Sequence, residues 1–345
     1  MNLFQAAAPA RPVSAAASPA LPSAPRQLVH ERGIPAFGMY QGIIDRLDWR
    51  ALKATPYQRL TRKLHHKRWQ YAAIAHPAFF IGVAIVDVGW TGTAFAYLFD
   101  RKRGEVIAAV SANGLPGLST QVEDRAFGDA SFHAGRCRLS FRRNGERLEL
   151  AVDAPQLKVA AHIQLTEMPP VLAVIAPANW LTHSTHKSGG LRSSGFADCQ
   201  DQRYSLDGAV AALDYSNGLL ARETRWRWAS AHALELGFNL QQGYMGDTEN
   251  AAWLHGKLIR LGPVSFDYQP EDPLQGWRMQ SDNGLLELDF TPEGARREDK
   301  NLLIAASRYV QPIGHFNGQI RDPDSGAVHL VRDLLGVTED HLSRW

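Results

Sequence analysis

The residues best suited to chemistry lie in the segment VAALDYSNGLLARETRWRWAS, which begins at residue 210. An Asn-Gly pair favours a two-residue hairpin loop, because both central residues of a type I′ turn need a positive φ. With Asn217-Gly218 as that loop, strand alternation predicts one face that combines a cation, a hydroxyl and several aromatic rings. This face would carry Leu213, Tyr215, Arg222, Thr224, Trp226 and Trp228. The opposite face would carry Asp214, Glu223, Arg225 and Arg227.

Such a face suits a pocket for an apolar ligand with a polar end. Lys187 would extend the polar end, since it shares a strand face with His183 and Thr185. The candidate ligand-binding residues are therefore Lys187, Tyr215, Arg222, Thr224, Trp226 and Trp228. In the alternative interpretation the two tryptophans are core residues, and Arg222 either reaches solvent along its stem or pairs with a buried acid.

The sequence contains no motif for a cofactor or a metal ion. The glycine-rich phosphate loops Gly-x-Gly-x-x-Gly and Gly-x-x-x-x-Gly-Lys are absent, as is the Gly-x-Ser-x-Gly elbow. His183 and His186 are spaced like a metal pair, but residues three apart on a strand point to opposite faces and cannot chelate one ion. Glu249 in GDTENAAW is interpreted as a loop acid and His315 in IGHFNG as a turn histidine. We expect no cofactor and no metal.

The formal net charge of +2 over 345 residues hides an uneven distribution. Residues 1–29 carry +2, residues 30–50 are neutral, residues 51–86 carry +6 without an acid, and the remaining 259 residues sum to −6. The run RLTRKLHHKRWQY also holds Trp69 and Tyr71, a crude footprint of a nucleic-acid surface. The rest of the chain is not basic, so we expect no nucleic-acid partner and favour a solvated helix face. Contact of 53–68 with nucleic acid or with a membrane of anionic lipid is the alternative.

The composition, 45% apolar and 21% charged, is typical of a globular protein. Only Cys137 and Cys199 occur, outside any Cys-x-x-Cys pair, which fits a reducing compartment and predicts a cytoplasmic location. The apolar stretch 69–99 is interrupted by Pro77, Asp87 and a GWTG turn signal. Its apolar residues recur at period two, which predicts strands and no transmembrane segment.

Five Asn-Gly dipeptides, at 113–114, 144–145, 217–218, 283–284 and 317–318, predict a protein rich in hairpins. The loop at 144–145 would set Phe141 opposite Leu148 and Leu139 opposite Leu150. The loop at 283–284 would set Trp277 opposite Phe290, Arg278 opposite Asp289 and Met279 opposite Leu288. Helical patterns are limited to Pro56 to about His66 and to a C-terminal helix that Thr338 would cap. The fold class is therefore mostly β, a sandwich or barrel with few short helices.

A composition shift and a Pro-containing stretch, TEMPPVLAVIAPA at 166–178, divide the chain. Residues 1–29 are rich in Ala, Pro and Ser and predict a disordered tail, in which Pro and Ser interrupt every candidate signal-peptide run. We expect an N-terminal β domain at 30–172 and a C-terminal β domain at 173–345.

Four motifs occur in order: KRWQYAAIAHPAFFIGVAIVDVGWTGTAFAYLFD, THSTHK, DYSNGLLARETRWRWAS and the chain end GVTEDHLSRW. Together they resemble the family called domain of unknown function 2804, from about residue 30 to 345. That family is similar to the lipocalin-like superfamily of carotenoid hydratases, tocopherol cyclase and AttH-type proteins. The resemblance implies two lipocalin-like (calycin-like) antiparallel β-barrel domains in one chain.

Some of those relatives hydrate or cyclise long unsaturated substrates by protonating a carbon–carbon double bond. This chemistry needs a proton donor and aromatic faces that stabilise a carbocation. No acid–base residue can be carried over to this chain, and Asp214 falls on the wrong face in the expected register. Arg222 and Lys187 suit an anionic head group better, which weakens the hydratase interpretation.

The leading functional hypothesis is binding of a lipophilic or amphiphilic small molecule in a β-barrel cavity. Whether the protein also catalyses an acid-dependent hydration, isomerisation or cyclisation stays open at this point, as does its oligomeric state. The alternative is a non-enzymatic structural or interaction protein whose barrels are filled by side chains.

Overall fold

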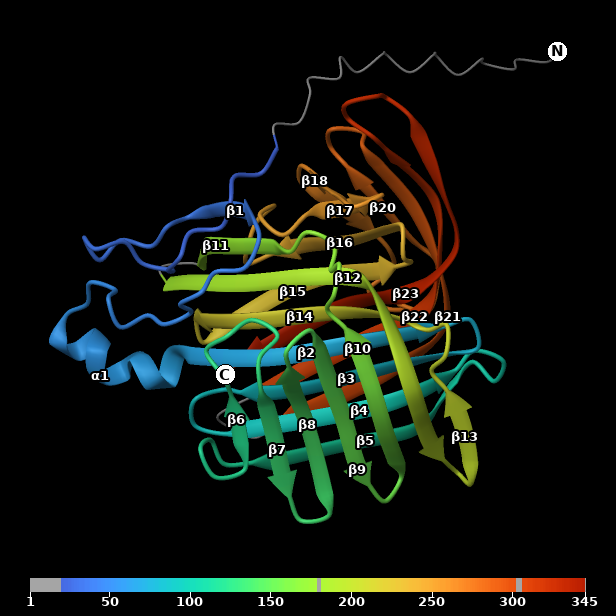
Figure 1. Ribbon diagram of the computed structural model, residues 1–345, viewed down its shortest axis with the longest axis horizontal. Helices are drawn as coiled ribbons and strands as arrows, with labels where there is room; N and C mark the ends of the chain where they lie inside the picture. The colour runs from blue at the N-terminus through green and yellow to red at the C-terminus, as the bar shows by residue number, and fades with distance from the viewer. Residues whose placement is uncertain (1–19, 179–180, 302–305, 345) are drawn as a thin grey trace.

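The computed structural model describes residues 20–178, 181–301 and 306–344 (Figure 1). Within these ranges the chain forms two curled antiparallel sheets, which make two barrel-like halves. The helix found in the described residues is α1 (Pro56–His65). The mostly β class with little helix is confirmed.

The first sheet has fourteen strands, and its main path runs β5-β4-β3-β2-β14-β12-β10-β9-β8-β7-β6. β1 pairs with β11, β11 also pairs with β12, and β13 pairs with β12. The strands are β1 (Gly38–Gln41), β2 (His66–His76), β3 (Phe79–Asp87), β4 (Gly92–Asp100), β5 (Glu105–Gly114), β6 (Thr120–Val122), β7 (Ala130–Ala134), β8 (Cys137–Asn144), β9 (Arg147–Ala154), β10 (Leu157–Gln164), β11 (Leu172–Ala178), β12 (Leu181–Cys199), β13 (Gln202–Ser205) and β14 (Val210–Leu219).

The second sheet has nine strands in the order β18-β17-β16-β15-β23-β22-β21-β20-β19. They are β15 (Glu223–His232), β16 (Leu236–Gly243), β17 (Ala251–Leu254), β18 (Lys257–Arg260), β19 (Val264–Asp267), β20 (Trp277–Ser281), β21 (Leu286–Asn301), β22 (Ala306–Arg321) and β23 (Val328–Arg344). The last strand, β23, pairs with both β15 and β22 and is therefore the central strand of this sheet.

Strand β3 is buried on both faces, and this explains the apolar stretch seen in the sequence. Alternate residues from Phe79 to Ile85 pack in the core of the first sheet. Phe80 and Ala84, which point the other way, pack against Trp228 and Val337 of the second sheet. The strands predicted over 69–99 are confirmed as β2, β3 and β4. No described helix has the length and apolar character needed to cross a bilayer.

The hairpin predicted at Asn283-Gly284 is confirmed with the expected register. Trp277 pairs with Phe290, and Arg278 and Met279 follow in step against their expected partners. The hairpin at 144–145 also forms, but Asn144 pairs with Arg147, so Gly145 and Glu146 make the loop. Phe141 therefore meets Leu150, two residues later than expected, and its apolar face is unchanged.

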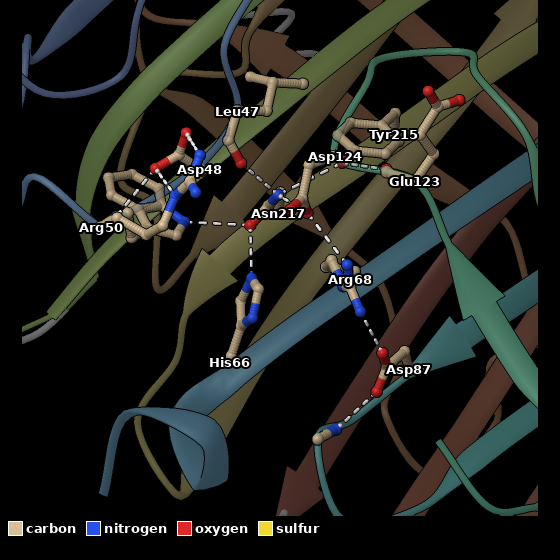
Figure 2. A network of polar contacts seen from close by, with 12 residues as sticks. Leu47, Asp48, Arg50, His66, Arg68, Asp87, Glu123, Asp124, Tyr215 and Asn217 are labelled. Carbon is tan, nitrogen blue, oxygen red and sulfur yellow. Dashed lines mark hydrogen bonds and ion pairs between the residues drawn. The ribbon is translucent and has the colours of Figure 1, made fainter. Parts of the chain in front are cut away.

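The hairpin predicted at Asn217-Gly218 is wrong. Both residues lie within β14, where the backbone pairs with β12 on one side and β2 on the other. The Asn217 side chain is instead a buried anchor: its Nδ2 donates to Leu47 O at 2.6 Å, and its Oδ1 accepts from Trp49 Nε1 at 3.0 Å (Figure 2). Glycine is needed at 218 because a Cβ there would come within 2.1 Å of His183 Nδ1.

Two further Asn-Gly pairs also lie in strands rather than hairpin loops. Gly114 ends β5 opposite Gly92, and Asn317 lies inside β22 opposite Asp289. In each case tertiary pairing outweighs the local preference for a turn.

The predicted helix at Pro56 is confirmed as α1, which Thr55 and Gln58 begin with a reciprocal capping box. The predicted C-terminal helix is wrong, because residues 328–344 form β23. Thr338 is buried in this strand opposite Ala229 and caps nothing. As a strand, this segment pairs its backbone with β15 on one edge and with β22 on the other, which a short surface helix could not do.

The expected tail at 1–29 falls mostly outside the described residues. Ala20 is the first residue that the structure describes, and Leu28 and Val29 are buried in the first core. The change from one sheet to the other comes between Leu219 and Glu223, whereas the boundary expected at 172/173 falls inside the first sheet, at the start of β11. The division at 172/173 stays a prediction.

Candidate functional site

A cavity of about 140 Å³ opens between the two sheets. The first sheet contributes residues of β2, β3, β4, β12 and β14, and the second contributes residues of β15, β16, β22, β23 and the loop after β16. Its aromatic walls are Trp69, Tyr71, Phe95, Trp226, Trp228, Tyr244 and Tyr309. The cavity was expected inside a barrel; the large apolar clusters fill the core of each sheet instead, and the space lies where the sheets face each other.

One end of the cavity holds a cluster of three ionisable side chains. Lys187 Nζ contacts Asp214 Oδ2 directly and lies 3.8 Å from Glu249 Oε2. Lys187 and Glu249 are 6% and 4% exposed, so bulk water does little to screen them. The Lys187 ammonium also lies 6.0 Å from the centroid of the Trp228 ring.

The pKa values in this cluster shift in directions that matter for proton transfer. Burial raises the pKa of Glu249, and the nearby Lys187 ammonium only partly opposes that shift. Burial alone would lower the pKa of Lys187, but the Asp214 and Glu249 carboxyl groups outweigh it, and the net shift is upward. The cluster therefore favours a charged Lys187 beside a Glu249 that retains its proton more readily than an ordinary glutamate.

A third acid of the cavity lining, Glu339 of β23, has fixed partners. Glu339 accepts hydrogen bonds from Trp226 Nε1 at 2.9 Å and from Gln311 Nε2 at 3.0 Å. Glu339 Oε1 also lies 3.2 Å from His341 Nδ1, and His341 Nε2 lies 2.7 Å from Ser343 Oγ. The His341 ring is 4.1 Å from the Trp226 ring, centroid to centroid. These contacts fix the orientation of Trp226.

Buried polar atoms on the cavity wall are left without partners among the described residues. The side-chain amide of Gln241 makes no hydrogen bond at either atom, and neither Asp214 Oδ1 nor Glu249 Oε1 has a partner. Buried polar groups normally find a partner, so each such atom calls for an explanation. A polar group of a ligand or a water molecule in the cavity would satisfy them.

The structure brings together three of the six candidate residues from the sequence. Lys187, Trp226 and Trp228 line the cavity. Tyr215 lies on the other face of β14, where its hydroxyl donates to Glu123 O at 2.8 Å. Thr224 shares the strand face of the tryptophans and is buried outside the lining, while Arg222 is exposed before β15 begins.

The failed hairpin explains this partial agreement. Because β14 and β15 belong to different sheets, no turn relates their faces, and the face holding Asp214 rather than Tyr215 meets the tryptophans. Asp214, which was expected on the opposite side, is therefore part of the site. Glu249, interpreted as a loop acid, is also part of it, because the loop after β16 folds inward.

Glu339 and His341 were missed because the chain end was predicted as a helix. The alternation of Val337, Glu339, His341 and Ser343 was the available signal, since it places all four on one face of a strand.

His183 and His186 do point to opposite faces of β12, as predicted. The His183 ring lies 5.7 Å from Tyr244, while His186 Nε2 accepts from Ile44 N at 3.2 Å on the other side. Both are buried, which lowers each pKa to about 3. His315 lies in β22, where Nδ1 is 2.9 Å from Glu293 Oε1.

Comparison with known proteins gives the family and the fold of this chain. The family model described as Domain of unknown function (DUF2804) matches residues 21–345. The chain belongs to this family. No curated protein matches it.

The DUF2804 chain shares its fold with several solved structures. A putative AttH from Nitrosomonas europaea is 14% identical with a TM-score of 0.52, over 84% of this chain and 96% of that one. CghA is 12% identical with a TM-score of 0.58, over 94% and 98%. Kievitone hydratase from Nectria haematococca is 9% identical with a TM-score of 0.49, over 81% and 88%. The predicted similarity to AttH-type proteins is confirmed at the level of the fold.

Proposed function

We propose that this DUF2804 protein binds an apolar, unsaturated small molecule between its two sheets and transfers a proton to it from Glu249. The observation that carries the proposal is a buried carboxyl group of raised pKa on the wall of an aromatic cavity. A general acid needs a pKa near the working pH, and burial raises the pKa of Glu249 toward that value.

The cavity size limits what reacts there. A volume of about 140 Å³ is close to that of a dry protein cavity of about 150 Å³ known to hold benzene. One ring or a short unsaturated segment fits, and the rest of a longer ligand extends through the open side. CghA, a protein of this fold, has a crystal structure with Sch210972, which supports ligand binding by this fold.

The walls suit the charge that such a reaction develops. When the carboxyl proton moves to one carbon of a double bond, the O–H bond breaks, a C–H bond forms and the other carbon becomes cationic. The faces of Trp226, Trp228 and Tyr244 stabilise that cation. Water then adds to the cation and returns a proton to the Glu249 carboxylate, which gives a hydration. If the same carboxylate instead takes a proton from the carbon next to the cation, a new double bond forms and the reaction is an isomerisation.

Asp214 and Lys187 support this role without transferring the proton themselves. The Asp214 carboxylate neutralises Lys187, so Glu249 is not required as the counterion and can remain protonated. The packed cores of both sheets, expected for a purely structural protein, do not account for the unpartnered polar atoms in the space between the sheets.

The test uses 4-hydroxystyrene, an electron-rich alkene with one ring, in deuterium oxide. Nuclear magnetic resonance measures deuterium incorporated at the terminal carbon and any hydrated product. Glu249→Gln should lower the rate by about 10²-fold or more, the range lost with a general acid. Glu235→Gln is the matched control, because that side chain is 79% exposed on the surface.

The proposal would be refuted for substrates of this class if the wild type does not quench its tryptophan fluorescence on adding the alkene and does not catalyse deuterium incorporation into it. Equal incorporation in wild type and Glu249→Gln would refute the role of Glu249.

A further inference from the structure

Helix α1 is turned the opposite way from an ordinary surface helix. Its polar face contacts the protein: Arg62 donates to Trp49 O at 2.9 Å and to Leu52 O at 3.3 Å, and His65 Nδ1 lies 3.1 Å from Leu220 O. No residue of α1 is buried. Surface helices of globular proteins normally bury their apolar stripe and expose their polar one.

The apolar face of α1 points to solvent. Tyr57, Leu60 and Leu64 follow the spacing of one helix face, and they are 74%, 80% and 58% exposed. The loop before β1 adds Ile34 and Phe37, which are about half exposed, and Phe37 lines the same hollow under α1 as Tyr57. Figure 1 shows α1 at one edge of the molecule. We call Ile34, Phe37, Tyr57, Leu60 and Leu64 the α1 patch.

Positive charge surrounds the α1 patch. Lys53, Arg59 and Lys63 are exposed beside it, and residues 51–86 contain no acid. A helix with exposed leucines on one face and Lys and Arg around them is typical of segments that lie in the interface of an anionic bilayer. There the leucines enter the boundary of the acyl chains and the cations meet lipid head groups.

Other occupants fit less well. Nucleic acid would bind the cations and leave the leucines exposed to water, since phosphate contacts involve no apolar patch. A second copy of the chain would bring two positively charged patches together without an acidic partner on either side. We therefore propose that α1 docks the protein on membranes that contain anionic lipid. Docking would place a binding site for lipophilic ligands beside their source, but it does not depend on the chemistry at Glu249.

The test is flotation of the full chain with vesicles of phosphatidylcholine alone or with added phosphatidylserine. The wild type should float with the anionic vesicles and dissociate from them as salt is added. Leu60→Gln with Leu64→Gln should weaken binding by about tenfold or more, because both apolar anchors are lost while helix propensity is kept. Leu118→Gln is the matched control, since this leucine is 82% exposed in another loop and should not affect binding.

A charge variant separates the two contributions. Arg59→Gln with Lys63→Gln should weaken binding to anionic vesicles by about fivefold per charge removed and leave the weak binding to neutral vesicles unchanged. Circular dichroism confirms that each variant keeps its fold.

Three results would overturn the proposal. The wild type could float no better with anionic than with neutral vesicles. The Leu60/Leu64 variant could bind as well as the wild type. The variants could instead abolish binding to duplex DNA, measured by filter binding, or self-association, measured by sedimentation velocity. Failure here is distinct from failure at the cavity, because Glu249→Gln should float like the wild type and the Leu60/Leu64 variant should keep the cavity reaction.

Discussion

Replacing Lys187 with methionine tests the polar cluster of the cavity most directly. Lys187 is 6% exposed and lies between Asp214, which it contacts, and Glu249 at 3.8 Å. Methionine has a similar length and keeps the packing against Trp228, but it removes the charge. The Asp214 carboxylate, whose side chain is 14% exposed, then lies in the cavity wall without its cation.

The expected loss follows from the contact between Lys187 and Asp214. Two unit charges about 4 Å apart interact by about 4 kcal/mol for an effective dielectric constant of about 20. Breaking a buried ion pair by removing one partner costs about 3–5 kcal/mol, because the other charge stays buried. We expect Lys187→Met to lower the free energy of unfolding by this amount at neutral pH.

A double variant shows that the loss comes from the unpaired charge. Lys187→Met combined with Asp214→Leu removes both charges and should recover at least half of the loss. The assay is urea unfolding followed by tryptophan fluorescence and circular dichroism. Lys158→Met, on an exposed position of β10, is the control and should change the free energy by less than about 0.5 kcal/mol. The argument fails if Lys187→Met costs under about 1 kcal/mol, as a surface pair would, or if the double variant is no more stable than Lys187→Met.

Three further predictions concern pH, an anchor and a glycine. Because the pKa of Glu249 is higher in the folded protein, its protonated carboxyl stabilises the fold below the ordinary pKa of 4.5, and this stabilisation is lost as the pH rises through the folded pKa. Over that pH range the free energy of unfolding of the wild type, measured in urea, should fall relative to that of Glu249→Gln. A difference between the two proteins that does not change with pH would contradict this. Asn217→Ala should cost about 1–3 kcal/mol and speed proteolysis near Trp49, since buried groups lose their partner; unchanged proteolysis would count against the anchor. Gly189→Ala should cost about 1–3 kcal/mol of stability through overpacking and so lower the melting temperature, because its Cβ would come within 2.1 Å of His232 Nδ1. An unchanged melting temperature would show that the His232 ring can move.

The β class, the hairpin at 283–284, α1 and the strands at 69–99 could be predicted from the sequence, because their signals are local. Alternation and turn chemistry decide which face of a hairpin is apolar, and Thr55 and Pro56 define the start of α1. The same local signals mislead at Asn217. There a side chain used as an anchor looks like a turn residue until its partners Leu47 and Trp49, far away in the sequence, are known.

The site itself was only half predictable for the same reason. Alternation within β15 correctly placed Trp226 and Trp228 together, and alternation within β12 placed Lys187 with His183. The relation between β14 and β15 depends on how two sheets face each other, which no short-range pattern encodes. Glu249 was recognisable only once its loop was seen to turn inward.

The burial of β3 on both faces has a consequence for how the protein folds. Phe80 and Ala84 cannot be covered until Trp228 and Val337 have been synthesised, and β2 must wait for β14 to complete its pairing. Contacts over such long separations slow folding and leave apolar strands transiently open to association with other chains. During synthesis the first half is therefore the aggregation-prone half. A fragment ending at residue 222 should need a chaperone or detergent to stay in solution, although most of its hydrogen-bonded ladder is already present.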